Sequence, residues 1–376
     1  MTGRMTIVEV ASRLGIGGVE SHVMRLSEGL FARGHRVILL VEDEAVYGEE
    51  TREMGAAVVV VPFDRSGRER AIAALSEETV DIIHAHNYRA ARFAGPLAPT
   101  IGAAYLMTVH GPRPWWQRAL FRAWSDPVLT VSEADRENIT GPFGVRRDSV
   151  VVGFLGVDVT RFRPGIDADD LRREWGVAPG ARLIVNVSRF SHRKARPALS
   201  LVETLPLVRD RISDASLVLV GGGPELERIR REAEKSHGDG SGRPARAVGP
   251  RTDIPRVLNA ADLAVATATV ALESLACGTP TIAYGRTGYF GPVTPENFEE
   301  GRALCFADHG RELPSRVEPR RLADDIISLL ADREGARRRA EVIRALIAER
   351  YSVERMVEHV ESLYERLLVG RGVERY

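Results

Sequence analysis

The chain has little of several features that would point to other classes of protein. Its 376 residues include only two cysteines, Cys277 and Cys305, which is too few for a disulfide framework and fits a reducing, cytoplasmic setting. Basic and acidic residues are equally frequent, 52 of each, so no global charge favours nucleic-acid binding. No apolar run is long enough to span a bilayer, and residues 1–5 lead directly into a strand pattern without the apolar core of a signal peptide.

Lysine is also scarce, since it occurs only at Lys194 and Lys235, whereas arginine is frequent throughout. Against that bias, a lysine at position 194 suggests that a compact ammonium is required there. An apolar content of 44% and a charged content of 28% are those of an ordinary globular protein. The length predicts two domains, each with its own core.

The first half of the chain alternates apolar strands with helices. A helix is predicted at about 19–33, ended by Gly34, and another at 72–77, and Ser132 is expected to cap a third. Continuous apolar strands between helices indicate a parallel sheet covered on both faces. The predicted strands are 6–10, 37–41, 57–61, 80–86, 104–109 and 128–131.

The same pattern restarts after a linker-like segment at 153–165. Strands are predicted at 183–187, 216–220, 264–268 and 281–284, a surface loop at 237–244, and closing helices at 319–331, 333–350 and 353–369. We therefore predict an α/β fold of two Rossmann-like, doubly wound parallel-sheet domains that face a deep cleft. Their expected bounds are 1–160, rejoined by 353–376, and 165–352.

Two cations follow the first strand of the second half. Arg189 and Lys194 come after an apolar strand, at the edge of the sheet where open α/β sheets bind ligands. A guanidinium fork and an ammonium suit a diphosphate. Glu273, which we place on a helix start before Gly278-Thr279-Pro280, can accept hydrogen bonds from a ribose. Together these residues predict a nucleotide-sugar site.

These segments resemble the retaining glycosyltransferases of family 4, which have the two-domain GT-B fold. The resemblance implies that Arg189 and Lys194 grip the diphosphate, that Glu273 holds the ribose, and that the last helix crosses back onto the first domain. It implies transfer of a hexose-type sugar from a nucleoside diphosphate, most often UDP, to an acceptor hydroxyl with retention of configuration. Neither a metal nor another cofactor is expected, because the two cations would stabilise the leaving diphosphate.

The chain departs from the family pattern at one of its two glutamates. The first glutamate of the usual pair, eight residues before Glu273, is replaced by Val265, and the loop that follows is shortened. Thr269 and Val270 in that loop, with Arg251, are assigned to the donor. The loss leaves open a non-catalytic transferase-like subunit. The alternative in another reaction class is a nucleotide-sugar 2-epimerase on the same fold.

Candidate residues of the first half lie at strand ends. Gly17 and Gly18 form a strand-to-helix turn where the backbone can approach a phosphate or a sugar. The resemblance places this turn near the donor phosphates and His110 beside the donor sugar, as a residue that shapes the site. It also gives His86 and Asn87 an acceptor-lining role.

Three further motifs have more than one interpretation. His84 and His86 lie two apart on a strand and could bind a metal, but the sequence shows no third ligand at a helpful spacing. The run Gly221–Gly223 resembles a phosphate loop but lacks its lysine, so it indicates a tight turn with Pro224 at the helix start. Trp115 and Trp116 could stack on an acceptor sugar, contact a membrane surface or pack in the core.

Overall fold

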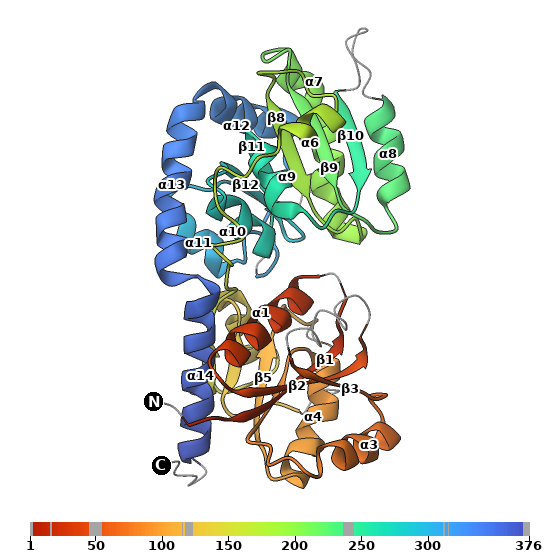
Figure 1. Ribbon diagram of the computed structural model, residues 1–376. Coiled ribbons are helices and arrows are strands. Elements are labelled where there is room, and N and C mark those ends of the chain that lie inside the picture. The colour runs from red at the N-terminus through yellow and green to blue at the C-terminus, as the bar shows by residue number, and fades with distance from the viewer. Residues whose placement is uncertain are drawn as a thin grey trace. The chain divides into compact units, whose positions relative to one another are not determined.

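The computed structural model describes residues 3–15, 17–44, 55–114, 116, 123–235, 244–310, 313–314 and 316–370. The chain divides into two compact units. Unit 1 comprises residues 1–156 and 351–376, and unit 2 comprises residues 157–350. Figure 1 labels the elements of both units. The predicted surface loop at 237–244 falls almost wholly outside the described residues.

Unit 1 is a parallel sheet with helices on both faces. Among the described residues its strand order is β3-β2-β1-β4-β5-β6-β7. The strands are β1 Thr6–Arg13, β2 Arg36–Asp43, β3 Ala57–Val60, β4 Ile82–Ala85, β5 Ala104–Val109, β6 Val128–Thr130 and β7 Val150–Val152. The helices are α1 Gly18–Ala32, α3 Arg65–Leu75, α4 Tyr88–Thr100, α5 Glu133–Thr140, the short 3-10 helix η2 Arg147–Ser149, and α14 Val353–Gly370.

The side chains of β1 alternate between two cores, as the two-residue period of a strand requires. Val8 and Val10 pack in a cluster with residues of α3 and α4. Ile7 packs on the other face, in a cluster that joins residues of α1 and α14. The last helix of the chain therefore covers the sheet of the first unit, as the resemblance implied.

Unit 2 repeats this architecture with one change at the sheet edge. Its strand order among the described residues is β10-β9-β8-β11-β12-β13, in which β13 pairs antiparallel with β12. The strands are β8 Leu183–Val187, β9 Ser216–Val220, β10 Ala245–Gly249, β11 Leu263–Ala266, β12 Thr281–Gly285 and β13 Gly288–Pro292. The helices are α6 Asp169–Glu174, η3 His192–Ala195, α7 Arg196–Arg209, α8 Leu226–Lys235, α9 Ile254–Ala260, α10 Ala268–Ala276, α11 Phe298–Ala303, α12 Pro319–Ala331 and α13 Arg333–Arg350.

A buried aspartate holds the central strand pair in the same way in both units. In unit 1, Asp81 precedes β4, and its carboxylate accepts from the N–H of Thr6 at 2.7 Å. In unit 2, Asp262 precedes β11 and accepts from the N–H of Leu183 at 2.9 Å. The backbone N–H of each aspartate returns a hydrogen bond to the carbonyl of the same residue, 2.9 Å in both cases. This repeated exchange sets the start of the two strands that flank the point where the strand order reverses.

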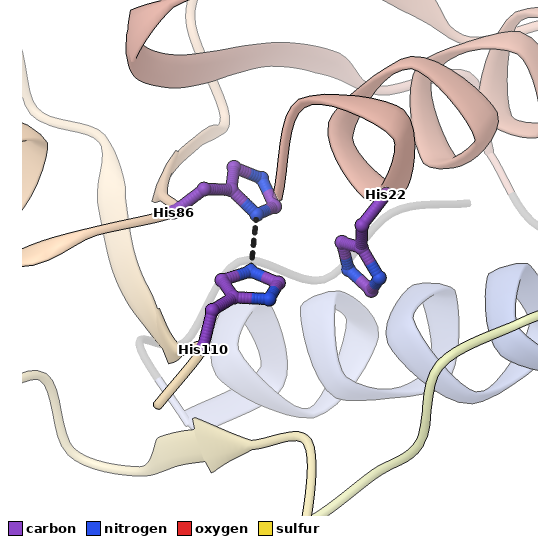
Figure 2. A group of neighbouring side chains, drawn as sticks. All are labelled: His22, His86 and His110. Atoms are coloured by element: carbon purple, nitrogen blue, oxygen red, sulfur yellow. Dashed lines mark hydrogen bonds between the residues drawn. The ribbon is translucent and has the colours of Figure 1, made fainter. Parts of the chain in front are cut away.

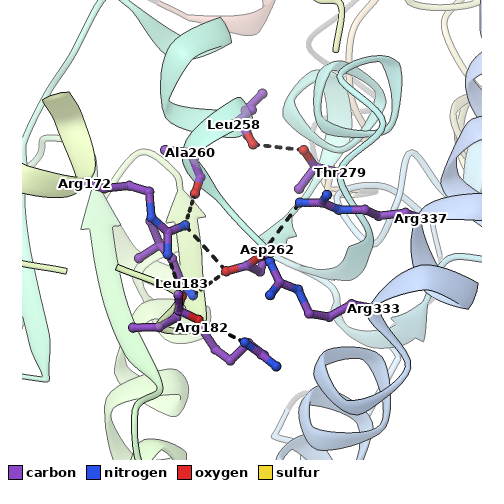
Figure 3. Close-up of polar contacts among 11 residues, drawn as sticks. Arg172, Arg182, Leu183, Leu258, Ala260, Asp262, Thr279, Arg333 and Arg337 are labelled. Atoms are coloured by element: carbon purple, nitrogen blue, oxygen red, sulfur yellow. Dashed lines mark hydrogen bonds and ion pairs between the residues drawn. The ribbon is translucent and has the colours of Figure 1, made fainter. Parts of the chain in front are cut away.

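Arginines surround the second of these aspartates. Arg172, from α6, contacts Asp262 at 3.5 Å, while Arg333 and Arg337 reach it from α13 (Figure 3). Because a buried carboxylate is costly unless it is paired, these arginines tie α6 and α13 to the base of the sheet.

Candidate active site

The candidate residues lie where the strand order of each sheet reverses. In unit 1, β1 pairs with β4 and β4 with β5, all parallel, so their carboxyl ends share one edge. Gly17 follows β1, His86 and Asn87 follow β4, and His110 follows β5. In unit 2, β8 and β11 are parallel neighbours, and Arg189 and Thr267 follow their carboxyl ends. Such switch points are the usual ligand sites of open α/β sheets.

Three histidines gather at this edge of unit 1. Figure 2 shows His22 on α1 together with His86 and His110. The Nδ1 of His86 lies 3.4 Å from the Nε2 of His110, and the His22 and His110 rings meet edge to face with centroids 4.6 Å apart. Neither ring nitrogen of His22 has a hydrogen-bond partner among the described residues, although the side chain is buried.

A buried polar network lies behind these histidines. Glu9, in the middle of β1, contacts the Nε2 of His86 and accepts from the Tyr364 hydroxyl of α14 at 2.9 Å. His84 lies 2.6 Å from both the Tyr364 hydroxyl and the Thr108 hydroxyl. Burial alone would raise the pKa of Glu9, but His84 and His86 lower it well below its usual value. Glu9 is therefore ionised.

Because a carboxylate only accepts, the proton positions follow. Tyr364 and the Nε2–H of His86 donate to Glu9, so the Nδ1–H of His84 donates to Tyr364, and Thr108 donates to the Nε2 of His84. Burial lowers the pKa of His84 to about 4 and raises that of Tyr364, which keeps the histidine neutral and the phenol protonated.

Within the described part of the chain, two groups of side chains have the spacing of metal ligands. The ligand atoms of His22, His86 and His110 lie within 4.8 Å of one another, and so do those of Glu9, His84 and His86. In the second group, hydrogen bonds already engage both nitrogens of His84 and the carboxylate of Glu9. The first group is where a transition metal could bind, because imidazole nitrogens suit such ions.

The other candidates of unit 1 have clear backbone roles. Asn87 caps α4, because its side-chain oxygen accepts from the N–H of Ala90 at 2.8 Å, and its amide also donates to Ser12. Gly17 precedes α1 without a side-chain cap, and Gly18 is exposed. His86 is completely buried. The acceptor roles of His86 and Asn87 and the donor role of the glycine turn stay predictions.

Glycines fix the backbone that carries Arg189. Gly221 and Gly223 have φ angles of 153° and 141°, and a Cβ at these positions would lie 1.8 Å from the carbonyl oxygen of Ser188 and 2.4 Å from that of Phe190. The Phe190 N–H donates to the carbonyl of Gly222 at 2.8 Å. The glycine run is therefore a support for the Arg189 loop. The helix that follows the glycine run, α8, begins at Leu226, later than the predicted start at Pro224.

Arg189 and Lys194 form the predicted diphosphate clamp. Lys194, the second of these two cations, has a buried partner. The Nζ of Lys194, in η3, donates to Oδ2 of Asp308 at 3.0 Å. Asp308 is buried, whereas Arg189 is exposed at the loop surface. A carboxylate in contact with the clamp lysine has no counterpart in the sequence predictions.

Two predictions about Glu273 and the shortened loop were wrong. The segment Thr267–Val270 is not a loop, because α10 begins at Ala268, and Thr269 and Val270 belong to its first turn. As a result, Glu273 lies in the second turn of α10 rather than at a helix start, and it is buried. The helix begins early because only Thr267 separates it from β11.

Arg251 is engaged within unit 2. Its guanidinium forms two hydrogen bonds to Asp253, of 2.7 and 2.8 Å, and one to Glu174 of 2.9 Å. These partners raise its pKa above the usual value. Its assignment to the donor stays a prediction.

Several residues of the site were missed in the sequence. Glu9 carried a usable signal, because a glutamate in the middle of an apolar strand must have a buried partner. His22 and Tyr364 carried none, since their neighbours are far away in the chain. Trp116 is 60% exposed, which excludes a core role for it, and Trp115 lies outside the described residues.

Family models match both halves of the chain. Residues 16–161 match the model described as Glycosyltransferase Family 4, and residues 181–332 match that of Glycosyl transferases group 1. Both matched segments include predicted site residues. The fold and these two matches define the class of protein, and the chain is a glycosyltransferase with the GT-B fold.

Curated relatives are similar over much of the chain. The GDP-mannose-dependent alpha-(1-6)-phosphatidylinositol monomannoside mannosyltransferase of Mycolicibacterium smegmatis is 28% identical over 78% of this chain and 82% of its own length. Its namesake in Mycobacterium tuberculosis is 31% identical over 64% of each chain. A D-inositol 3-phosphate glycosyltransferase of Actinosynnema mirum is 33% identical over 43% of this chain and 41% of its own length.

Solved structures share the fold at low identity. A glycosyltransferase from Rickettsia africae has a TM-score of 0.80 at 16% identity, with 98% of this chain and 99% of that chain covered. Anabaena HepE in complex with UDP and glucose has a TM-score of 0.77 at 17% identity, with 96% and 100% covered. No helix in the described part of the chain is long and apolar enough to cross a membrane.

Proposed function

We propose that the chain is a retaining glycosyltransferase of family 4 that transfers a hexose from a nucleoside-diphosphate sugar to an acceptor hydroxyl. The observation that carries this proposal is the placement of Arg189 and Lys194 directly after β8, at the switch point of a sheet in a GT-B chain. Their two positive charges would stabilise the diphosphate as the sugar leaves it. Glu273 would hold the ribose, and the matched transferases favour transfer over epimerisation.

The names of the relatives support GDP-mannose as the first donor to test, in place of the UDP-sugar that family frequency suggested. They also support a lipid-linked or inositol-containing acceptor, which a protein in peripheral contact with a membrane could reach. His110 would help to shape the site through a hydrogen bond to the sugar. Its ring lies at the same sheet edge, with Nε2 3.4 Å from the Nδ1 of His86.

No metal takes part in the proposed transfer, since two cations serve the diphosphate. Turnover should therefore persist in excess EDTA. A strict requirement for Mg²⁺ would contradict this assignment of the clamp, and a requirement met only by Zn²⁺ would point to the three-histidine group.

The test of the function is the removal of each clamp cation. Arg189→Ala and Lys194→Ala should each reduce turnover by a factor of about 10² or more, because each removes charge stabilisation of the transition state. Transfer from radiolabelled GDP-mannose and UDP-glucose to a mixture of lipid and inositol acceptors measures this directly. Arg193→Ala, an exposed position beside Lys194 in η3, serves as the control. Wild-type rates in both clamp variants would overturn the proposal.

A further inference from the structure

A strained segment of unit 2 lies beside the predicted donor site. Cys305, Phe306 and Ala307 have φ angles of 48°, 49° and 70°, a left-handed conformation that costs non-glycine residues about 1 kcal/mol or more each. All three residues are buried. A backbone of this kind persists only where its surroundings hold it in place.

Hydrogen bonds from two neighbouring elements hold the strained segment. At the start of α10, the Thr267 hydroxyl donates to the carbonyl of Phe306 at 2.6 Å, and the Ala268 N–H donates to that of Cys305 at 3.1 Å. At the turn between β12 and β13, the N–H and the hydroxyl of Thr287 both donate to Ala307, at 3.0 and 2.8 Å. The segment is therefore fixed against the carboxyl ends of β11 and β12, and the end of β11 belongs to the candidate site.

The residue that this segment presents is Asp308. Its backbone carbonyl accepts from Arg286, and its Oδ2 accepts from Lys194 at 3.0 Å. Its Oδ1 is buried and has no hydrogen-bond partner among the described residues, with the Nε of Arg286 at 3.9 Å. Burial alone would raise the pKa of Asp308, but Lys194, His309 and Arg286 more than offset it and lower the pKa below its usual value. The unsatisfied atom is thus an anionic acceptor.

We propose that Asp308 binds the transferred sugar of the donor, with Oδ1 accepting a hydrogen bond from a sugar hydroxyl while Oδ2 orients Lys194 toward the diphosphate. The inference rests on the proposed function. The buried Oδ1 of Asp308 needs a hydrogen-bond donor, and a sugar hydroxyl can supply one. A diphosphate has no donor to offer, and its negative charge is repelled by the carboxylate. Asp308 also places a carboxylate beside the start of α10, in a chain that lacks the first glutamate of the family pattern.

This arrangement predicts discrimination between the donor and the nucleoside diphosphate left after transfer. The sugar hydroxyl offsets the repulsion between Asp308 and the phosphates, but the free diphosphate has no such group. Removing the charge should therefore weaken binding of the donor and leave binding of the product unchanged or tighter. A residue with a merely structural role would change both affinities together.

The experiment measures binding of GDP-mannose and of GDP to the full chain by calorimetry, with UDP-glucose and UDP as a second pair. Asp308→Asn, which keeps the shape of the side chain, should weaken the sugar nucleotide about tenfold or more, as loss of a hydrogen bond to a charged group implies. GDP should bind at least as tightly as to the wild type. Asp325→Asn, which removes a carboxylate bound to Tyr289, is the matched control and should change neither affinity.

A series of donors, each lacking one sugar hydroxyl, keeps the inference testable even where Asp308→Asn does not fold. With the wild type, one analogue should bind about tenfold more weakly than the intact donor. Where Asp308→Asn folds, it should be insensitive to that same deletion. The inference would be overturned if Asp308→Asn changed the affinities for GDP-mannose and GDP equally, or if no single sugar hydroxyl affected binding to the wild type. If the inference fails but Arg189→Ala still weakens binding of GDP, the proposed function stands. A wild-type chain that binds neither nucleotide pair would overturn the function itself.

Discussion

At the scale of residues, burial and neighbouring side chains determine the charge of three buried groups of unit 1: Glu9, His22 and His84. Glu9 is fully buried, yet His84 and His86 lower its pKa, so the carboxylate stays charged in the core. Burial lowers the pKa of His84 to about 4 and that of His22 well below its usual value. The charged Glu9 carboxylate therefore accepts hydrogen bonds from its neighbours, while His84 and His22 stay neutral.

This arrangement predicts that unit 1 loses stability on mild acidification. An unfolded histidine takes up a proton near pH 6.5, whereas folded His84 does so only near pH 4. Between these values the unfolded chain binds more protons, so stability falls as the pH falls, by about 1.4 kcal/mol per pH unit for each such histidine. Hydrogen exchange of β1 and β4, corrected for its intrinsic pH dependence, measures this slope.

The variant His84→Gln should lower that slope by about 1.4 kcal/mol per pH unit, the contribution of one titrating histidine. Glutamine can still pair with Thr108 and Tyr364 but does not titrate. His192→Asn is the control, because His192 is exposed and asparagine tolerates its φ of 43°. An unchanged slope in His84→Gln would contradict the neutral assignment of His84.

At the scale of elements, the glycine run after β9 determines where Arg189 lies. Gly221→Ala should destabilise unit 2 by about 2 kcal/mol and weaken GDP binding, because a Cβ 1.8 Å from the Ser188 carbonyl must displace the Arg189 loop. Thermal unfolding and calorimetry measure the two effects. Gly222→Ala is the control, since its Cβ would meet only Pro250, at 3.5 Å. Equal effects of the two substitutions would contradict a specific role for Gly221.

Local sequence patterns predicted the elements where the chain makes its own contacts. The strands Leu183–Val187 and Ser216–Val220 and the helix Pro319–Ala331 have the predicted bounds, and Ser132 caps α5 through the N–H of Asp135. The edge strand β13 was missed, because five residues with two glycines and a proline lack the apolar alternation of a strand. It forms instead by antiparallel pairing with β12.

The candidate site was predictable only where a motif is continuous in the sequence. Arg189 and Lys194 follow their strand directly, so their position at the sheet edge could be read from the order of elements. Asp308 lies 114 residues from Lys194, and Tyr364 lies 355 residues from Glu9. Side chains at such separations meet through the fold, and no local pattern records their contact.

At the scale of the whole molecule, unit 1 is discontinuous, since α14 closes a core built by the first part of the chain. Met356, Val357, Val360, Leu363 and Tyr364 are all nearly inaccessible and pack with residues of α1 and β1. Helices α1 and α14 approach each other closely, because a Cβ at Gly29 would lie 2.4 Å from Val357. Glu361 of α14 also bonds His35 at 2.8 Å and Arg33 at 2.7 Å.

A chain that ends at Arg350 should therefore lose the fold of unit 1 and keep that of unit 2. Burial of these five side chains contributes about 10 kcal/mol, which is comparable to the stability of a whole domain. Hydrogen exchange should show protection lost in β1, β2 and α1 and retained in β8, β9 and β11. Binding of GDP should persist in weakened form, because Arg189, Lys194 and Glu273 belong to unit 2. A chain that ends at Gly370 keeps α14 and serves as the control, and native protection of β1 in the shorter chain would show that unit 1 folds without its last helix.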